Sequence, residues 1–263
     1  MRWFLRAIGF IVVFYLLPAG CMFAHHNVTD GNKPWWELRR DSSEQAPPAA
    51  STDEAIIQVY AARAARWRGS VGVHTWIATK RRSENTYTRM EVLGYAVRRG
   101  RDAVRIRTGS PDNYWFGNHP ELLRDIRGAE KVEALIDRLY EAANAYPYNN
   151  VYRVWPGPNS NTFTAYLARA VPDLRLDLPS TAMGKDYVPL SKVVSKSPSG
   201  TGVQISLKGY AGLLVGLEEG VELNVLGFTA GLDLYPPALK LPAAGRIGFS
   251  DYRRFDEADL IER

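Results

Sequence analysis

Two polar residues far apart in the chain could form a nucleophile and its base. Ser160 lies in Asn159-Ser160-Asn161-Thr162-Phe163, where a loop rich in proline and glycine meets a segment with helical spacing. A residue at a helix N-terminus sees free backbone N–H groups and the positive end of the helix dipole, which stabilise a developing oxyanion. His74 lies in a strand-like segment and could remove the proton of the hydroxyl. The pattern predicts a serine nucleophile with a histidine base.

A third polar group should orient the histidine, and Glu91, in the next strand-like segment, is the candidate. We expect the backbone N–H groups of Asn161 and Thr162 to hold the oxyanion. The residues expected to contact a substrate are Trp76, Trp155, Asn159, Asn161 and Thr162. A second interpretation stays open, because Asn and Ser are also common N-cap residues and a histidine on a strand is often a core residue.

The elements that must position these residues form an α+β body over residues 54–190. Alternating apolar residues around Ile57, Val73, Tyr87 to Val97 and Val104 predict three or four antiparallel strands. From Glu121 to Tyr146 the spacing indicates two helices separated by Gly128, and a short helix follows from about Asn161 to Ala170. We therefore expect an antiparallel sheet packed against two or three helices.

Residues 191–263 are predicted to form a β-rich C-terminal extension. Val203 to Leu234 is strand-like and interrupted by glycines, and Val221, Leu223 and Val225 alternate with polar residues. Glu218-Glu219-Gly220 is typical of a hairpin turn. Two to four strands are expected between Val203 and Leu234, where they would either extend the first sheet or form a small subdomain.

The N-terminal residues 1–24 are predicted to attach the chain to a membrane. Arg2 and Arg6 precede an uncharged apolar stretch from Ala7 to Ala24, which would span about 27 Å as a helix. Leu17-Pro18-Ala19-Gly20-Cys21 resembles a bacterial lipoprotein signal. An uncleaved anchor, a lipoprotein signal and an ordinary cleaved signal all stay open. Each alternative exports the body to the periplasm. Residues 25–53 are predicted to form a linker, and the bacterial inner membrane is the expected partner of the N-terminal segment.

Composition narrows the chemistry that the body could perform. Cys21 is the only cysteine among 263 residues, which excludes an intramolecular disulfide and any site built on several cysteines. The chain has no phosphate-binding loop, no Gly-x-Ser-x-Gly elbow and no His-Glu-x-x-His helix. We expect no metal or nucleotide cofactor. The net charge of +5 is too small to indicate nucleic acid as a partner.

A strand histidine followed by a helix that opens Asn-Ser-x-Thr-Phe resembles the circularly permuted papain-like hydrolases, which include the NlpC/P60 amidases and lecithin:retinol acyltransferases. Those families use a cysteine, a histidine and a third polar residue on an antiparallel sheet. The resemblance implies His74 as the base, Ser160 in place of the cysteine and Glu91 as the third residue. It favours an amidase or esterase. Because a serine hydroxyl is far less acidic than a thiol, a non-catalytic module that binds peptide, glycan or lipid is the alternative.

Over residues 35–250 the chain also resembles an uncharacterised bacterial envelope family, domain of unknown function 3750. The segments that carry this resemblance are residues 58–63, 67–69, 73–78, 114–117, 153–163 and 217–222. No biochemical activity is assigned to that family.

Overall fold

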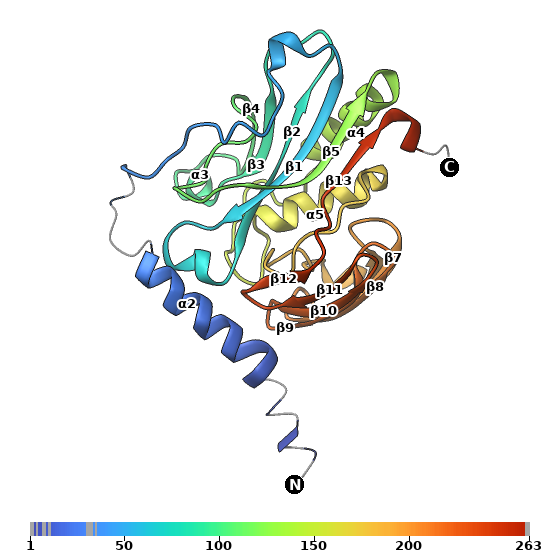
Figure 1. Ribbon diagram of the computed structural model, residues 1–263. Coiled ribbons are helices and arrows are strands. Elements are labelled where there is room, and N and C mark those ends of the chain that lie inside the picture. Colours follow the sequence, from blue (N-terminus) through green and yellow to red (C-terminus); the bar gives the residue numbers. More distant parts are fainter. Residues whose placement is uncertain are drawn as a thin grey trace.

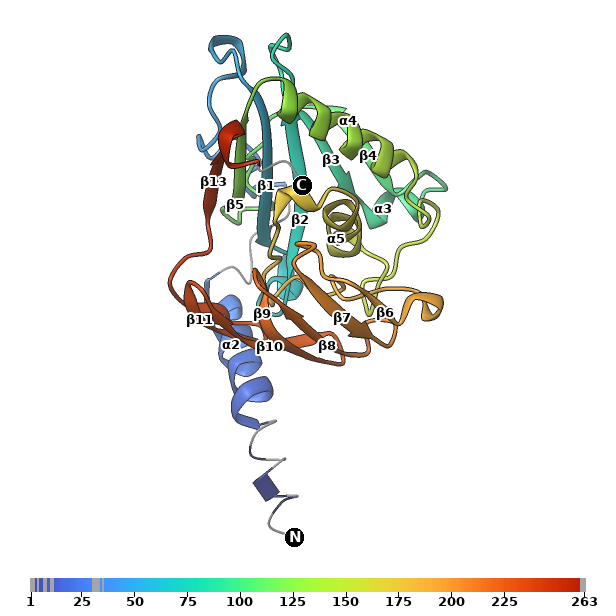
Figure 2. The same cartoon turned by 90° about the vertical axis from the view of Figure 1, so that its right-hand side faces the viewer.

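The computed structural model describes residues 3, 5, 6, 9, 12–29, 34 and 36–260. The body has two β-sheets, and α4 and α5 pack against one face of the first (Figures 1 and 2). Figure 2 shows α5 between the two sheets. The mixed α+β class predicted from the sequence is confirmed.

The first sheet has six strands in the order β13-β5-β1-β2-β3-β4. All neighbouring strands are antiparallel except β13, which runs parallel to β5. The C-terminal segment therefore returns to complete the sheet that the N-terminal half begins. The strands are β1 (Ala55–Arg63), β2 (Val73–Lys80), β3 (Thr88–Val92), β4 (Val104–Thr108), β5 (Glu121–Gly128) and β13 (Arg253–Asp256).

Strand β1 is buried on both faces, so its odd and even residues enter different clusters. Ile57 and Val59 face the helices α4 (Glu130–Asn144) and α5 (Ser160–Ala170) in the main core. Tyr60 and Ala62 lie on the other face with Trp76 and Ala78. His74 lies on the same face of β2 as Trp76 and Ala78, next to this second cluster. The short helix α3 (Gly94–Val97) follows β3.

The helix predicted over residues 121–128 is wrong, because this segment forms strand β5. Leu122 pairs with Tyr60 while Arg124 pairs with Val59, so a β-bulge sets Leu123 between them. The bulge turns Leu122 toward the second cluster and Leu123 toward the main core. Adjacent apolar residues on opposite faces break the two-residue period, which is why the segment resembles a helix in sequence. The helix that begins after Gly128 is confirmed as α4.

The second sheet has seven antiparallel strands in the order β12-β11-β10-β9-β8-β7-β6. Turn Glu218–Glu219 joins β8 to β9 as predicted. The polar residues Glu222 and Asn224 are buried on the inner side of β9, while Val221, Leu223 and Val225 are exposed. The strands are β6 (Val194–Lys196), β7 (Gly202–Ser206), β8 (Ala211–Gly216), β9 (Gly220–Val225), β10 (Phe228–Leu234), β11 (Pro237–Leu241) and β12 (Gly245–Gly248).

The inward polar residues of the second sheet form a buried ionic cluster. Lys240 donates to Asp177 at 2.7 Å and to Glu222 at 2.8 Å, and Lys185 pairs with Glu222 and with Asp186. Each charge in the cluster thus has an opposite charge beside it, which its burial requires.

Near the N-terminus the chain forms the π-helix Val12–Leu16 and helix α2 (Leu17–Thr29). Several positions of the predicted segment 1–24 lie outside the described residues. Helix α2 extends into the predicted linker 25–53. Within the described part of the chain, no helix combines the length and apolar character needed to cross a membrane. Residues 36–53 of the linker are irregular apart from the short 3₁₀ turn Ala49–Ser51. They contact the body, where Asp112 accepts hydrogen bonds from the Ser42 hydroxyl and the Gln45 N–H.

Candidate functional site

His74 on β2 and Glu91 on β3 are hydrogen bonded, with 3.0 Å between Nε2 and Oε2. Glu91 is fully buried, and it also accepts from Arg89 at 3.1 Å and from Arg107 at 3.0 Å. Burial by itself would raise the pKa of the Glu91 carboxyl. The hydrogen bond with His74 and the charges of the two arginines outweigh burial and lower this pKa to about 2. Glu91 is therefore ionised at neutral pH and can only accept hydrogen bonds.

The state of the histidine follows from its surroundings. Burial lowers the pKa of His74, and the hydrogen bond with Glu91 opposes that effect only in part. The imidazole is therefore neutral at pH 7. Because Glu91 can only accept, Nε2 carries the proton and Nδ1 keeps a lone pair. The ring stacks on Trp115, with 3.9 Å between ring centroids, and lies 5.7 Å from Trp76.

Ser160 is the first residue of α5, and Asn159 is the N-cap. Asn159 Oδ1 accepts from the backbone N–H groups of Asn161 and Thr162 at 3.0 and 3.1 Å, and the Thr162 hydroxyl closes a capping box. These two N–H groups are occupied, so the predicted oxyanion role of both is wrong. Among the described residues, no hydrogen-bond partner is found for the backbone N–H of Ser160, which leaves it as the free donor of this turn.

The two asparagines beside Ser160 fasten α5 to its neighbours. Asn159 Nδ2 donates to the carbonyls of Val154 and Met183. Asn161 Nδ2 donates to the carbonyls of Val73 and Met183, and its Oδ1 accepts from the Thr75 hydroxyl. These bonds hold the start of α5 against β2, one residue from His74 on either side.

A pocket of about 550 Å³ brings the predicted residues together. His74, Asn159, Ser160, Asn161 and Trp155 all line it. The Ser160 hydroxyl makes no hydrogen bond with His74 or with any other residue that the structure describes. Most of the remaining lining is apolar: Trp67, Val71, Val73, Trp115, Val154, Met183, Leu226 and Phe228.

Two predicted substrate residues lie away from the pocket lining. Trp76 is fully buried next to His74 on the same face of β2, and its Nε1 donates to the Pro111 carbonyl at 2.7 Å. The guanidinium of Arg89 lies 4.1 Å from the Trp76 ring. Trp76 therefore supports the histidine rather than lining the pocket. Thr162 is buried in the capping box, where its hydroxyl donates to the Gly184 carbonyl at 2.8 Å.

Sequence reasoning missed two residues of the pocket lining, Leu226 and Phe228. Trp115 reaches the histidine from the loop between β4 and β5, and it belongs to the aromatic stretch Tyr114-Trp115-Phe116, which on sequence alone could line a substrate groove or pack in the core. Leu226 and Phe228 come from the second sheet, more than sixty residues beyond Ser160, and no local pattern marked them. Among the described residues, no group of three or more His, Cys, Asp or Glu side chains is arranged to hold a metal ion.

Comparison with known proteins identifies the family. The model for a protein of unknown function, DUF3750, matches residues 54–187, which include both sheet strands of the His74–Glu91 pair and all of α5. No curated protein and no solved structure matches the chain. On the family match, which covers half of its length, the chain belongs to the DUF3750 family.

Proposed function

We propose that this protein is a bacterial envelope protein, tethered to the inner membrane by its N-terminal segment, that hydrolyses an ester or amide with an apolar acyl group. The observation that carries the proposal is one pocket lined by a neutral histidine and by a serine at a helix N-terminus, with an ionised, buried carboxylate hydrogen bonded to that histidine. The order of strand histidine, proline-rich loop and capped helix supports a permuted papain-like ancestry.

The residues would act in a fixed sequence. The Ser160 hydroxyl oxygen attacks the carbonyl carbon of the substrate while Nδ1 of His74 takes its proton. The free N–H of Ser160 donates to the oxyanion, and Glu91 stabilises the imidazolium that forms. When the intermediate collapses, His74 returns the proton to the leaving alcohol or amine. A water molecule then attacks the acyl-serine with the same histidine as base, which restores Ser160.

The apolar lining favours an acyl chain over a highly polar substrate. Trp115, Trp155, Met183, Leu226 and Phe228 would contact such a chain, and each methylene buried there contributes about 0.8 kcal/mol. Among the described residues that line the pocket, Arg68 is the only charged one.

Hydrolysis of p-nitrophenyl esters of increasing chain length tests this proposal. We expect His74→Ala and Ser160→Ala each to abolish turnover. Ser160→Cys should raise it, because a thiol loses its proton to a neutral histidine more readily than a hydroxyl does. Hydrolysis that is unchanged in His74→Ala would refute the mechanism.

A binding protein for an apolar ligand is the second candidate. The missing hydrogen bond between Ser160 and His74 favours it, because the hydroxyl is not aligned with its base. Binding of a fluorescent fatty acid, measured beside ester hydrolysis, distinguishes the two. Ser160→Ala should keep its affinity for the fatty acid under both, but only the catalytic function predicts hydrolysis that this substitution abolishes. Saturable binding by wild-type protein that hydrolyses none of the esters would select the binding function.

A further inference from the structure

The outer face of the seven-stranded sheet is apolar across strands β7–β11. In strands β7–β11, which the structure describes in full, no outward position holds a charged residue. Several of these side chains are more than half exposed, as Leu234 is at 74 %. The large apolar residues that are exposed on outward positions of these strands are Val203, Ile205, Leu213, Val215, Val221, Leu223, Val225, Leu232 and Leu234.

This face is the reverse of the arrangement usual for a sheet in water. The charged and polar residues of the same strands, among them Glu222, Asn224, Asp233 and Lys240, are buried on the inner side. Exposed apolar patches of this extent mark interaction sites, because soluble monomers rarely present them to water. The strands alternate as lipid-facing strands do, with polar residues turned inward. Their backbone groups are paired within the sheet, as contact with hydrocarbon requires.

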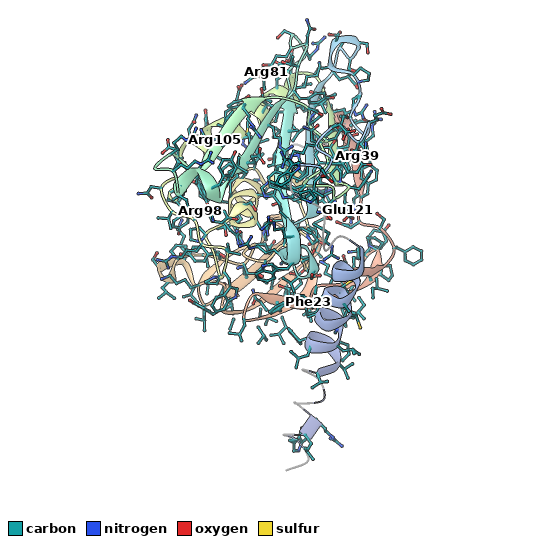
Figure 3. All side chains as sticks on the ribbon, turned by 90° about the vertical axis from the view of Figure 1, so that its left-hand side faces the viewer. Phe23, Arg39, Arg81, Arg98, Arg105 and Glu121 are labelled. Atoms are coloured by element: carbon teal, nitrogen blue, oxygen red, sulfur yellow. The ribbon has the colours of Figure 1, made fainter. Side chains whose placement is uncertain are left out.

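The N-terminal segment reaches the same face. The Tyr15 hydroxyl donates to the carbonyl of Leu223 at 3.1 Å, and Leu16, Leu17 and Phe23 are exposed beyond it. Figures 1 and 2 show α2 leaving the body on the side of the seven-stranded sheet. In Figure 3, Phe23 lies on that side, whereas Arg81 and Arg105 lie on the part of the body built on the six-stranded sheet. A lipid bilayer would cover both the apolar face of the sheet and the exposed apolar residues of the helix. A second copy of the chain packed on the sheet would leave those helix residues in water.

The edges of the face carry residues that suit a membrane interface. Tyr210 and Tyr235 lie in the turns at the ends of the strands and are exposed. Lys196 is the charged outward residue of the edge strand β6, and Lys192 precedes that strand. Tyrosines concentrate where headgroups meet acyl chains, and lysines are attracted to anionic headgroups. We propose that the seven-stranded sheet lies on the surface of a lipid bilayer with its apolar outer side chains inserted among the acyl chains.

This orientation would bring the His74 pocket to the membrane. Leu226 lies in the turn between β9 and β10, is more than half exposed and lines the pocket, and Phe228 begins β10. A ligand could then pass from the bilayer to the pocket over this turn. The docking surface itself depends on neither catalysis nor binding in the pocket.

Fluorescence quenching in vesicles tests the orientation on the full chain. A polarity-sensitive label is attached at Val215→Cys, on the outer face, in a chain that carries Cys21→Ser. The matched control is Ser83→Cys, in the exposed turn between β2 and β3 beside Arg81. Both chains are inserted into phosphatidylcholine and phosphatidylglycerol vesicles, with nitroxide-labelled lipid or aqueous iodide as quencher. We expect lipid quenching to be several-fold stronger at position 215, and iodide quenching several-fold stronger at position 83.

Leu213→Glu with Leu223→Glu provides a second variant, because both side chains are exposed and the sheet should still fold. It should lose the lipid quenching of the label at position 215. Iodide quenching at position 215 as strong as at position 83 would overturn the proposal. Protection from iodide that disappears on dilution, with no lipid quenching, would show that a second copy covers the sheet and would also overturn it.

Discussion

Replacing the buried carboxylate of the site by an amide should destabilise the protein markedly. In Glu91→Gln, the guanidinium of Arg89 loses its charged partner while it stays almost fully buried, and its Nε already lacks a hydrogen bond to any described residue. The pKa of Glu91 is lowered from 4.5 to about 2. At about 1.36 kcal/mol per pKa unit, this corresponds to about 3 kcal/mol of stability at pH 7. Removal of one partner of a buried ion pair costs a similar amount.

The pH dependence of this loss has a definite sign. A carboxyl whose pKa is lowered on folding stabilises the folded state fully above its unfolded pKa of about 4.5, and the contribution disappears as the pH falls toward 2. The difference in unfolding free energy between the wild type and Glu91→Gln should therefore stay constant from pH 7 to about pH 5. It should shrink below that. Urea unfolding followed by tryptophan fluorescence measures it, with Trp76 and Trp115 beside the site as probes.

Arg107→Gln is the matched control, because it removes an arginine that contacts the same carboxylate but is 57 % exposed. An exposed partner contributes about 0.2–1 kcal/mol. The reasoning would be refuted by a Glu91→Gln protein as stable as the wild type, or by an Arg107→Gln protein that loses as much stability.

Three further substitutions test the supports of the site and the second sheet by thermal unfolding. Lys240→Met leaves the buried carboxylates of Asp177 and Glu222 without this cation and should lower the unfolding free energy by about 3–5 kcal/mol. A loss of less than about 1 kcal/mol would mean that water reaches the cluster. Asn159→Ala removes the cap of α5 and should cost about 2 kcal/mol, whereas Thr162→Ser keeps the capping hydroxyl and should cost less than about 1 kcal/mol. Gly184→Ala should lower the unfolding free energy by about 3 kcal/mol, because φ is +95° and the new Cβ would collide with the Asn159 amide. The control is Gly72→Ala, whose new Cβ would lie 3.4 Å from its nearest atom, so its unfolding temperature should stay near that of the wild type.

The sequence predicted those parts of the site that depend on local patterns. Strand alternation around Val73 and Met90 indicated that His74 and Glu91 belong to strands, and β2 and β3 pair. The asparagine and serine before a helical segment correctly predicted where α5 begins. The same asparagine argues against the oxyanion prediction, because an asparagine N-cap accepts hydrogen bonds from the second and third backbone N–H groups of its helix.

Other parts depend on contacts between distant segments. The bulge opposite Val59 and Tyr60 hid strand β5, because a bulge is set by the partner strand and not by the segment itself. Alternation in β9 predicted a strand but not which side faces the body, since a two-residue period is the same for both faces. The buried side of Glu222 is decided by Lys185 and Lys240, which lie in other elements.

Covalent labelling of Ser160 tests directly whether this serine is an activated nucleophile. The full chain is incubated with an alkyl fluorophosphonate, which reacts with a serine activated by a neighbouring base, and the modified peptide is identified by mass spectrometry. We expect one adduct on Ser160 in the wild type, a strongly reduced yield in Glu91→Gln and none in His74→Ala. An unmodified Ser160 in the wild type, or equal labelling in His74→Ala, would contradict the proposed mechanism.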